Sequence, residues 1–421
     1  MDESVLDKLK ILAESAKYDV SCASSGTSRG HKAGAIGSAA GWGICHSFAE
    51  DGRCISLLKV MLTNYCIYDC AYCINRRSND LPRATLSVSE LVELTIEFYR
   101  RNYIEGLFLS SGVVRSPDYT MERLVRVAKD LRQVHRFNGY IHLKSIPGAS
   151  RELVNEAGLY ADRLSVNVEI PKEENLKLLA PEKDHKSVFA PMKYIQQGVL
   201  ESKEERQKFR HAPRFAPAGQ STQMIVGATS ESDKDILYLS SALYGRPTMK
   251  RVYYSGYVSV NTYDTRLPAL KQPPLVRENR LYQADWLLRF YQFKVDEIVD
   301  DTFPDLDLEI DPKLSWALRH PEQFPVDINK ADYEMLLRVP GIGVKSAKLI
   351  VASRRFSRLG FYELKKIGVV MKKAQYFITC RELPLQMQTV NELSPQRVRS
   401  LLLPKPKKKV DDRQLVLDFG E

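Results

Sequence analysis

The sequence predicts an α/β protein, in which a partial (β/α)6 barrel is followed by an all-α domain. Across residues 55–260, apolar runs of strand length alternate with amphipathic segments of helix length, as in a parallel sheet covered by helices. A loop with three closely spaced cysteines follows the first of these strands. Residues 326–421 carry 19 Lys and Arg against 10 Asp and Glu, so they hold +9 of the net charge of +10.

Residues 1–54 form an extension before the barrel. Its first 18 residues have the apolar period of an amphipathic helix and lack the pattern of a secretory signal. Residues 19–43 are rich in Gly, Ser and Ala, which is typical of a loop. Cys22, Cys45 and Cys54 could hold an auxiliary metal site, although buried free cysteines are the alternative that their irregular spacing leaves open.

The seven cysteines are an odd number, which favours a reducing, cytoplasmic compartment over a disulfide framework. No run of about 18 apolar residues is present, so we expect no membrane partner.

The barrel is expected to span residues 55–270. Ser87 and Glu90 form a capping box at the start of its first helix. The strands are expected at 56–62, 107–109, 140–143, 164–168, 224–226 and 251–260, and the helices at 87–101, 119–134, 151–157 and 233–243. Reactive groups of such a sheet gather at the carboxyl ends of its strands.

The three cysteines Cys66, Cys70 and Cys73 follow the first strand in a C-x3-C-x2-C pattern. Thiolates are the usual ligands of iron–sulfur clusters. Three cysteines on a four-iron cluster leave one iron open to a small molecule, as an open position does in a catalytic zinc site. A structural zinc site normally needs a fourth protein ligand, and none stands at zinc spacing. The pattern therefore predicts a [4Fe–4S] cluster.

This motif resembles the radical S-adenosylmethionine (radical SAM) superfamily. The resemblance implies that the open iron binds the amino and carboxylate groups of SAM, and that SAM is cleaved to a 5′-deoxyadenosyl radical. Tyr72 matches an aromatic that lies near the adenine in that superfamily. Ser110, Ser111 and Gly112 stand where a glycine-rich turn contacts the SAM amino group, but they lack its acid and first glycine. The other contacts implied are Asn167 and Glu169 for the ribose and Gly227 near the adenine; ordinary strand-end residues are the alternative.

Residues 271–325 are expected to be a helical extension and linker, and residues 326–403 a helical domain. Two helical patterns there flank Pro340-Gly341-Ile342-Gly343. Glycines let a backbone approach a phosphate closely, and a helix N-terminus binds the anion. The pattern recurs 27 residues later around Gly368, without the proline and the second glycine.

These repeats resemble the tandem helix–hairpin–helix module of DNA repair proteins, with a generic αα-hairpin as the alternative. The resemblance implies sequence-independent contacts with the DNA backbone. The residues expected to make them are Gly341, Ile342, Gly343, Lys345, Lys348 and Gly368.

Residues 404–421 are a basic linker followed by a tail. Gln414, Leu415, Leu417 and Phe419 resemble the hexapeptide by which bacterial repair and replication proteins bind the sliding clamp. The alternative is a terminal strand that pairs with the protein's own sheet.

Both ends together, with the segment 215–221 between them, resemble the bacterial family of DNA modification/repair radical SAM proteins. This implies an enzyme that uses a [4Fe–4S] cluster and SAM to modify or repair a DNA nucleotide, linked to a uracil-DNA-glycosylase-like partner. No residue that acts on the substrate is identified. The alternatives are an RNA or tRNA base-modifying enzyme and a redox-sensing DNA-binding protein.

Overall fold

The computed structural model describes residues 3–18, 44–48, 54–381 and 393–403. The chain forms two compact units, Met1–Leu281 and Tyr282–Glu421. The boundary falls within helix α8 (Leu275–Phe290). The second unit therefore contains both the helical domain and most of the segment that was expected to be its linker.

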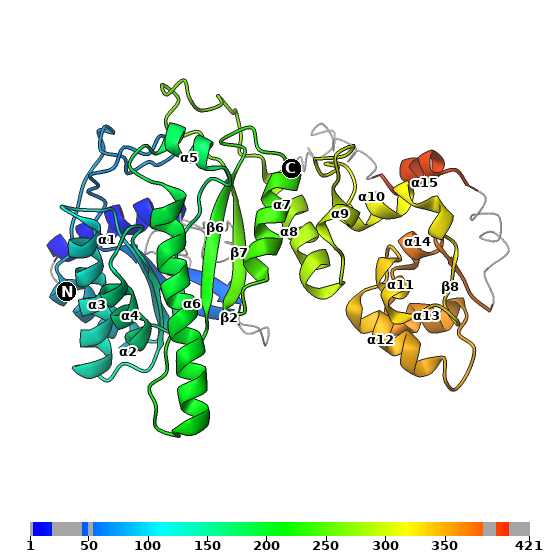
Figure 1. Ribbon diagram of the computed structural model, residues 1–421, viewed down its shortest axis with the longest axis horizontal. Helices are drawn as coiled ribbons and strands as arrows, with labels where there is room; N and C mark the ends of the chain where they lie inside the picture. Colours follow the sequence, from blue (N-terminus) through cyan, green and yellow to red (C-terminus); the bar gives the residue numbers. More distant parts are fainter. Residues whose placement is uncertain (1–2, 19–43, 49–53, 382–392, 404–421) are drawn as a thin grey trace, which may run out of the picture. The chain divides into compact units, whose positions relative to one another are not determined.

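The first unit is built on a seven-stranded sheet that curls into a half-barrel (Figure 1). The strands lie in chain order, and all are parallel except the first, which pairs antiparallel with the second. They are β1 (Ile44–Phe48), β2 (Cys54–Met61), β3 (Gly106–Ser110), β4 (Tyr140–Lys144), β5 (Arg163–Ser165), β6 (Gln220–Val226) and β7 (Met249–Gly256). The alternation predicted for β2–β7 is thus confirmed, whereas β1 was not anticipated.

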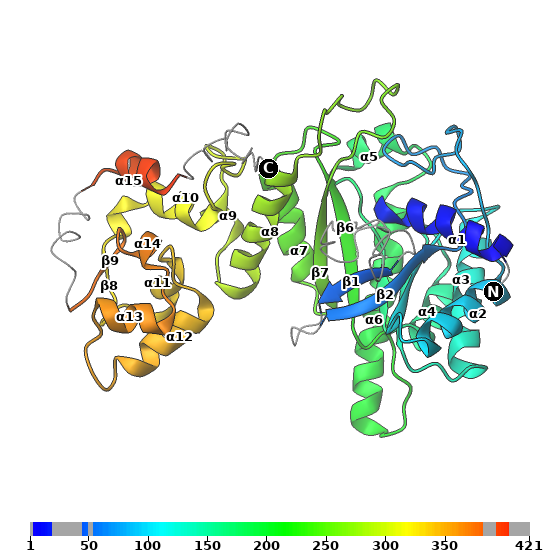
Figure 2. The ribbon, with the colours of Figure 1, turned by 180° about the vertical axis from the view of Figure 1, so that it is seen from behind.

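Helices connect the parallel strands and cover the outer face of the sheet. Figure 1 shows α3, α4 and α6 on this side, and Figure 2 shows β1 and β2 from behind. The predicted capping box at the start of α2 is confirmed, since Ser87 Oγ accepts from the Glu90 amide at 3.1 Å and Glu90 accepts from the Ser87 amide at 2.7 Å. The helices of this unit are α1 (Glu3–Ser15), α2 (Val88–Arg100), α3 (Pro117–Gln133), α4 (Arg151–Tyr160), α5 (Glu173–Leu179), α6 (His185–Lys208) and α7 (Asp233–Tyr244), with a 3-10 turn at Ala16–Tyr18.

The two faces of the sheet differ in character because side chains alternate along each strand. The outer face carries buried leucine, isoleucine and valine, such as Leu107, which pairs with Ile141, and Leu143, which pairs with Leu164. The inner face carries mainly polar side chains. Its register places Phe108 beside His142, Ser165 beside Ser221 and Gln223 beside Tyr253. A polar inner face is suited to binding a polar molecule.

The segment 215–221 lies before and at the start of β6, at the edge of the sheet opposite the cysteine loop. The Phe215 ring is buried between α4 and α6. A Cβ atom on Gly158 or Gly198 would lie 2.1 or 2.5 Å from that ring. This segment therefore ties two helices to the sheet and stands away from the site.

The second unit is mainly helical. Its helices are α9 (Val295–Ile298), α10 (Pro312–Arg319), α11 (Tyr333–Arg338), α12 (Val344–Ser353), α13 (Phe361–Ile367), α14 (Met371–Ala374) and α15 (Pro395–Leu402), with a 3-10 turn at Pro321–Gln323. The short strands β8 (Val326–Asp327) and β9 (Ile378–Thr379) pair in parallel at the two ends of the α11–α14 region. Within the described part of both units, no helix is long and apolar enough to cross a membrane.

Candidate functional site: a cysteine loop and a polar sheet face

The cysteine loop connects β2 to α2 at the carboxyl edge of the sheet, as predicted. Cys70 and Ala71 are buried in an apolar cluster with Leu179 and Tyr257, which come from segments far along the chain. The Ala71 amide donates to the Leu179 carbonyl at 2.7 Å. The loop is therefore packed against the barrel and is not a free surface loop.

Arg83 closes the loop at its base. Its guanidinium donates to the carbonyls of Asn75 at 2.9 Å, Arg76 at 2.7 Å and Asn79 at 3.0 Å, and also to that of Asn64. One planar cation thus satisfies carbonyls before and after the three cysteines. A rigid set of donors of this kind fixes the backbone path between them.

Two residues of the loop after β7 hold the cysteine loop from the other side. The Asn261 amide donates to the carbonyls of Ala71 at 2.5 Å and Cys73 at 3.0 Å. Arg76, which is 5% exposed, pairs with Asp69 and Asp264 at 2.7 Å each. The hydrogen bond from Arg76 lowers the pKa of Asp69, and hydrogen bonds from Arg266 and Arg76 lower the pKa of Asp264. The sequence analysis did not find Arg83, Asn261 or Asp264, because residues that bind backbone carbonyls have no characteristic spacing.

The three thiols come from one short loop at the carboxyl edge of the sheet. In a four-iron cluster each cysteine binds a different iron, so these thiols could hold three of the four irons. Burial raises the pKa of Cys70, and burial together with Cys70 and Cys66 raises the pKa of Cys73 to about 12. Binding of iron must therefore displace protons from these thiols.

A cation lies beside the thiols. The Lys183 ammonium stands 5.9 Å from the centroid of the Tyr72 ring. Burial opposes the charge of Lys183, but Cys70, Tyr72 and Glu169 outweigh it and raise the pKa. The Tyr72 hydroxyl is itself buried without a hydrogen-bond partner among the described residues, and burial raises its pKa well above the ordinary value. The Tyr72 ring thus packs against the apolar cluster, and its hydroxyl is left to bind a polar group of a ligand.

The residues expected to form a turn at the end of β3 lie against the cysteine loop. A Cβ atom on Gly112 would lie 2.2 Å from the Tyr65 carbonyl, and the Gly112 amide donates to the Thr63 carbonyl at 2.8 Å. Ser111 Oγ donates to the Gly112 carbonyl at 2.6 Å. Ser110 Oγ is buried and has no partner within the described ranges, so it can bind a molecule on the inner face. Gly112 is accordingly required by the close approach of two loops.

The residues expected at the ends of β5 and β6 come together on the inner face. Asn167 donates to Gln223 at 3.3 Å, and the Glu169 carboxylate lies 3.9 Å from Lys144. Glu169 adopts φ +64°, and its backbone bonds to β6 on both sides. Together with Ser221, whose buried Oγ has no partner in the described chain, these groups form a polar surface.

Gly227, also expected to contact the cofactor, follows β6 with φ +83°. A Cβ atom there would lie 3.1 Å from Pro274. The glycine is thus needed for the turn itself, and its role in binding stays a prediction.

The expected auxiliary site lies partly outside the described residues. Cys22 falls in the segment 19–43, of which nothing is described. Cys45 belongs to β1 and Cys54 to β2, where Cys54 pairs with Phe48, three residues along β1 from Cys45. The auxiliary site therefore remains a prediction.

The two glycine turns of the second unit have matching backbones. Gly341 adopts φ +91° and Gly368 φ +93°, at the predicted offset of 27 residues. A Cβ atom on Gly341 would lie 2.6 Å from the Val370 carbonyl, which explains why that position needs glycine. In turn, the Cβ position of Gly368 lies 3.8 Å from Ser346 Oγ in α12. Each turn therefore packs on the other helix pair.

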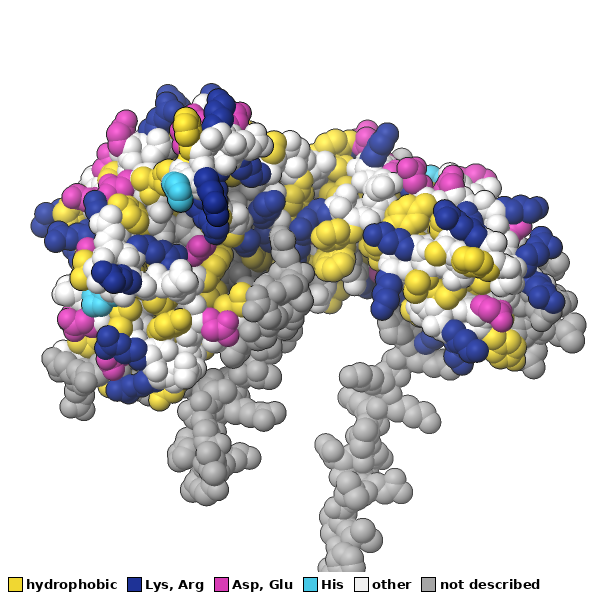
Figure 3. All heavy atoms as spheres, turned by 90° about the horizontal axis from the view of Figure 1, so that it is seen from below, with side chains coloured by type: hydrophobic (Ala, Val, Ile, Leu, Met, Phe, Trp, Pro, Cys, Tyr) yellow, Lys and Arg dark blue, Asp and Glu magenta, His cyan; other side chains and the backbone are white. Residues whose placement is uncertain are grey.

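Ile342 is 1% exposed, its amide donates to the Val339 carbonyl at 3.2 Å and its carbonyl accepts from Lys313 at 2.6 Å, so it offers no polar group to a ligand. Lys345 and Lys348, in contrast, are exposed. Further cations surround the turns and the loop after α12. The exposed ones include Arg355, Arg358, Lys365, Lys366 and Lys372. Figure 3 shows Lys and Arg side chains spread over one face of this unit between hydrophobic ones. Such a surface suits a polyanion.

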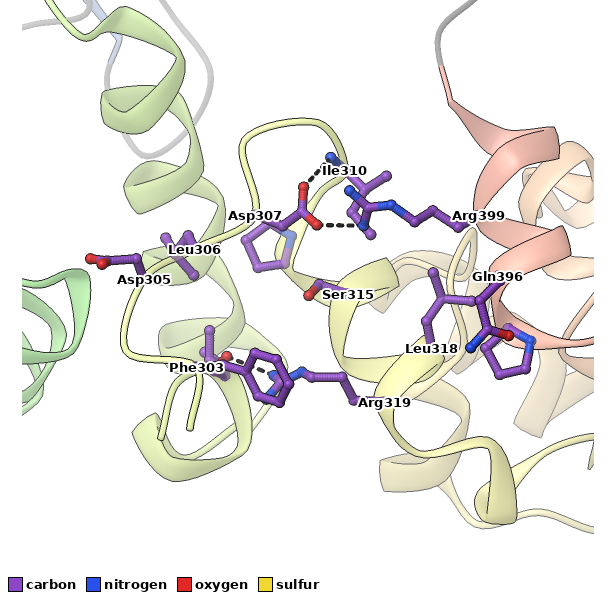
Figure 4. Close-up of a pocket in the computed structure, with 13 residues that line it drawn as sticks. Phe303, Asp305, Leu306, Asp307, Ile310, Ser315, Leu318, Arg319, Gln396 and Arg399 are labelled. Atoms are coloured by element: carbon purple, nitrogen blue, oxygen red, sulfur yellow. Dashed lines mark hydrogen bonds and ion pairs between the residues drawn. The ribbon is translucent and has the colours of Figure 1, made fainter. Parts of the chain in front are cut away.

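A separate pocket of about 300 Å³ lies in the second unit, lined by the 303–310 loop, α10 and α15 (Figure 4). Both arginines that line it are ion-paired: Arg399 pairs with Asp307 and with Glu309, and Arg319 pairs with Asp300 at 3.1 Å. The two ion pairs of Arg399 join α15 to the 303–310 loop, and we assign the pocket no ligand.

Replacing Arg83 with methionine should weaken cluster binding severalfold. The change leaves buried carbonyls of the loop without their donor, and each unsatisfied group costs about 1–3 kcal/mol. Iron content and cluster absorbance after anaerobic reconstitution measure the effect. Arg77→Met is the matched control, because Arg77 is exposed in the same loop. Equal iron content in the two variants would show that the hydrogen bonds of Arg83 are not needed for cluster binding.

Comparison with known proteins identifies the domain that carries this site. Residues 60–199 match the model of the Radical SAM superfamily. No curated protein matches the chain. Members of this superfamily use a [4Fe–4S] cluster and S-adenosylmethionine, which are therefore the cofactors of this domain.

Several solved structures are similar. The [FeFe]-hydrogenase maturase HydG has 12% identity and a TM-score of 0.41, over 82% of this chain and 78% of that one. SuiB from Streptococcus suis, bound to S-adenosylmethionine, has 10% identity and a TM-score of 0.37, over 54% and 44%. Coproporphyrinogen III oxidase HemN from Escherichia coli has 14% identity and a TM-score of 0.34, over 61% and 56%. Similarity at this level supports no inference about substrate.

Proposed function

We propose that this chain, which contains a radical SAM superfamily domain, is an enzyme that modifies or repairs a nucleotide of DNA. The observation that carries the proposal is the presence, in one chain, of the cysteine loop and of two left-handed glycine turns 27 residues apart. The first feature supports the radical chemistry, and the second supports a helix–hairpin–helix module that binds the DNA backbone.

The residues of the first unit have distinct roles in this proposal. Cys66, Cys70 and Cys73 would hold the cluster, and Arg83 and Asn261 keep the backbone between them in one conformation. When bound, the two cofactors supply one-electron chemistry that ends in hydrogen-atom abstraction from a substrate. The packed loop and the apolar cluster behind it exclude water from that side of the thiols.

The polar inner face of the sheet is where we place the substrate. Ser110 and Asn167 stay assigned to S-adenosylmethionine, whereas Ser221 offers a buried hydroxyl group and Gln223 an amide that can form hydrogen bonds with a base edge. A base inside a duplex cannot reach such a surface, so it must be rotated out of the helix. The catalytic groups that act on the substrate are not assigned.

The second unit would hold the DNA. At the first turn, the Gly343 backbone amide at the start of α12 can approach a phosphate, because Gly343 carries no side chain. Exposed Lys345 and Lys348 add positive charge beside it. Contacts of this kind carry no sequence information, so binding should be salt-dependent and nearly independent of sequence.

The experiment that tests the function has two arms. Anaerobically reconstituted protein is reduced with dithionite in the presence of S-adenosylmethionine, and 5′-deoxyadenosine is measured by chromatography. Formation of 5′-deoxyadenosine would exclude the redox-sensing alternative. Competition between duplex DNA and tRNA for the full-length protein then separates the DNA proposal from the RNA alternative, and preferential binding of tRNA would overturn it.

The tail supports a second proposal, recruitment by the sliding clamp. Gln414, Leu415, Leu417 and Phe419 lie outside the described residues, so this rests on their sequence alone. A peptide of residues 411–421 should bind purified clamp with a Kd on the order of micromolar. Changing Gln414, Leu417 and Phe419 to alanine should remove binding. If neither the wild-type peptide nor the full-length protein binds the sliding clamp, this proposal is wrong. The uracil-DNA-glycosylase-like partner likewise stays a proposal from sequence resemblance.

A further inference from the structure

Lys313 of α10 is a buried lysine, only 7% exposed. Its ammonium donates to the Ile342 carbonyl at 2.6 Å and lies 4.8 Å from the centroid of the Tyr291 ring. A buried charge is costly unless it is paired or hydrogen-bonded. Asp311, whose carboxylate favours the charged form of Lys313, is already paired with Lys373 at 2.6 Å. The Ile342 carbonyl is therefore the main polar partner that the structure gives this ammonium.

The Ile342 carbonyl and the Gly343 amide belong to the same peptide group. Because a peptide group is planar and trans, its carbonyl and N–H point in opposite directions. The ammonium on one side of this peptide thus fixes the direction of the N–H on the other side. A cation at the carbonyl also polarises the peptide, which makes the N–H a stronger donor.

Tyr291 supports the same arrangement. A hydrogen bond joins its hydroxyl to the Val344 backbone, so the next amide of the turn is taken by the protein. A Cβ atom on Gly343 would lie 3.6 Å from this hydroxyl. Lys313 and Tyr291 therefore brace the two consecutive peptides at the start of α12 from one side and leave the Gly343 N–H directed away from Lys313.

We propose that Lys313 is a positioning residue for nucleic-acid binding: through the Ile342 carbonyl it orients and polarises the Gly343 amide toward a backbone phosphate. The inference rests on the proposed function, because it takes the first glycine turn as a phosphate site. It adds a buried residue from outside the hairpin, one that touches no phosphate itself.

The charge on Lys313 depends on pH in the physiological range. Burial lowers its pKa to about 7; Asp311 acts in the opposite direction, and Lys373 and Arg338 lower it further. The Tyr291 ring also faces the ammonium, and burial raises the pKa of Tyr291, so this ring stays neutral. Lys313 is thus charged below pH 7 and loses its charge as the pH rises through 7. DNA affinity should fall over the same interval.

The test uses full-length protein and a fluorescein-labelled DNA duplex, with anisotropy measured from pH 6 to 8.5 at constant ionic strength. The wild-type Kd should increase about fivefold across this range, which corresponds to about 1 kcal/mol. Lys313→Met should bind at the weak end of this range at every pH. Lys313→Arg, which stays charged, should bind at the tight end without pH dependence. Lys330→Met removes one exposed charge of the same unit and should keep the wild-type pH profile.

Unfolding measurements separate this role from a loss of structure. The folded pKa of Lys313 lies below its ordinary value of 10.5, so the unfolded chain binds more protons between about pH 7 and 10.5. Its contribution to stability therefore rises with pH in that window, and this rise should be absent from Lys313→Met. If Lys313→Met does not fold, the inference is tested by the pH dependence of DNA binding by the wild type and by Lys313→Arg.

Each result bears on one proposal. Wild-type protein that binds DNA with a flat pH profile, or a folded Lys313→Met that binds like the wild type, overturns the inference and leaves the proposed function standing. Wild-type protein that fails to bind any nucleic acid overturns the proposed function, and the inference with it.

Discussion

Protein in which Cys66, Cys70 and Cys73 are all replaced by alanine will contain no cluster and form no 5′-deoxyadenosine. Wild-type protein reconstituted without oxygen should hold about four irons per chain if it binds one cubane cluster. The variant loses all three protein ligands, and its iron content should drop to background. Its fold should survive, because Arg83 and Asn261 hold the loop through backbone carbonyls that the change leaves in place.

Cys380→Ala is the matched control, since Cys380 belongs to the second unit. It should retain full iron content and activity. Residual 5′-deoxyadenosine formation by the triple variant would contradict the assignment of the cluster to these cysteines. A second variant, with Cys22, Cys45 and Cys54 changed to alanine, tests the auxiliary site. An iron content of about eight per wild-type chain that falls to about four in this variant would support the site. An iron content equal to that of the wild type would exclude it.

Gly343→Val should reduce DNA affinity about tenfold or more, which is at least about 1.4 kcal/mol, without unfolding the second unit. Gly343 has φ −94° and ψ 170°, a conformation open to any residue, and its Cβ position lies 3.6 Å from the Tyr291 hydroxyl. The valine side chain would stand beside the amide that faces the phosphate. Titration of a labelled duplex measures the loss, and Ala352→Val adds similar bulk at the exposed far end of α12 as the control.

Gly341→Val should behave differently, although both glycines belong to the same motif. Its φ of +91° alone costs a valine about 1–3 kcal/mol, and the Val370 carbonyl would lie 2.6 Å from the new Cβ. Thermal unfolding should show a destabilised second unit, whereas Gly343→Val should keep the wild-type midpoint. Unchanged DNA affinity in Gly343→Val would place the binding surface elsewhere on the protein.

The order of elements in the first unit followed from local patterns. Strand and helix periods predicted β2–β7 and the helices α2, α3, α4 and α7, but not the bounds of α5 and α6, and Ser87 with Glu90 predicted the start of α2. The strand β1 could not be predicted in this way, because it has only five residues, follows a segment rich in Gly, Ser and Ala, and gains its hydrogen bonds from β2. Short strands of this kind depend on a partner more than on their own residues.

The cysteines of the site were predicted, but the residues that position them were not. A metal-binding motif has a spacing because its ligands must converge on one group. Arg83 and Asn261 bind carbonyls, which every residue carries, so their own positions have no signature. The glycine motif alone also does not show which of its glycines the fold requires. Close packing requires glycine at position 341, whereas the space around position 343 would admit a side chain.

The hydrogen bonds from Asn261 to the cysteine loop also bear on the order of events during synthesis of the protein. This side chain bonds to Ala71 across 190 residues of sequence, and Arg76 pairs with Asp264 across 188. At about 5–20 residues per second, the ribosome needs about 10–40 s to add the chain between them. During that time the cysteine loop has Arg83 but lacks Asn261 and Asp264, which hold it from the other side. Stable cluster insertion should therefore follow synthesis of the whole first unit, and a truncated chain that ends before Asn261 should leave its thiols open to oxidation.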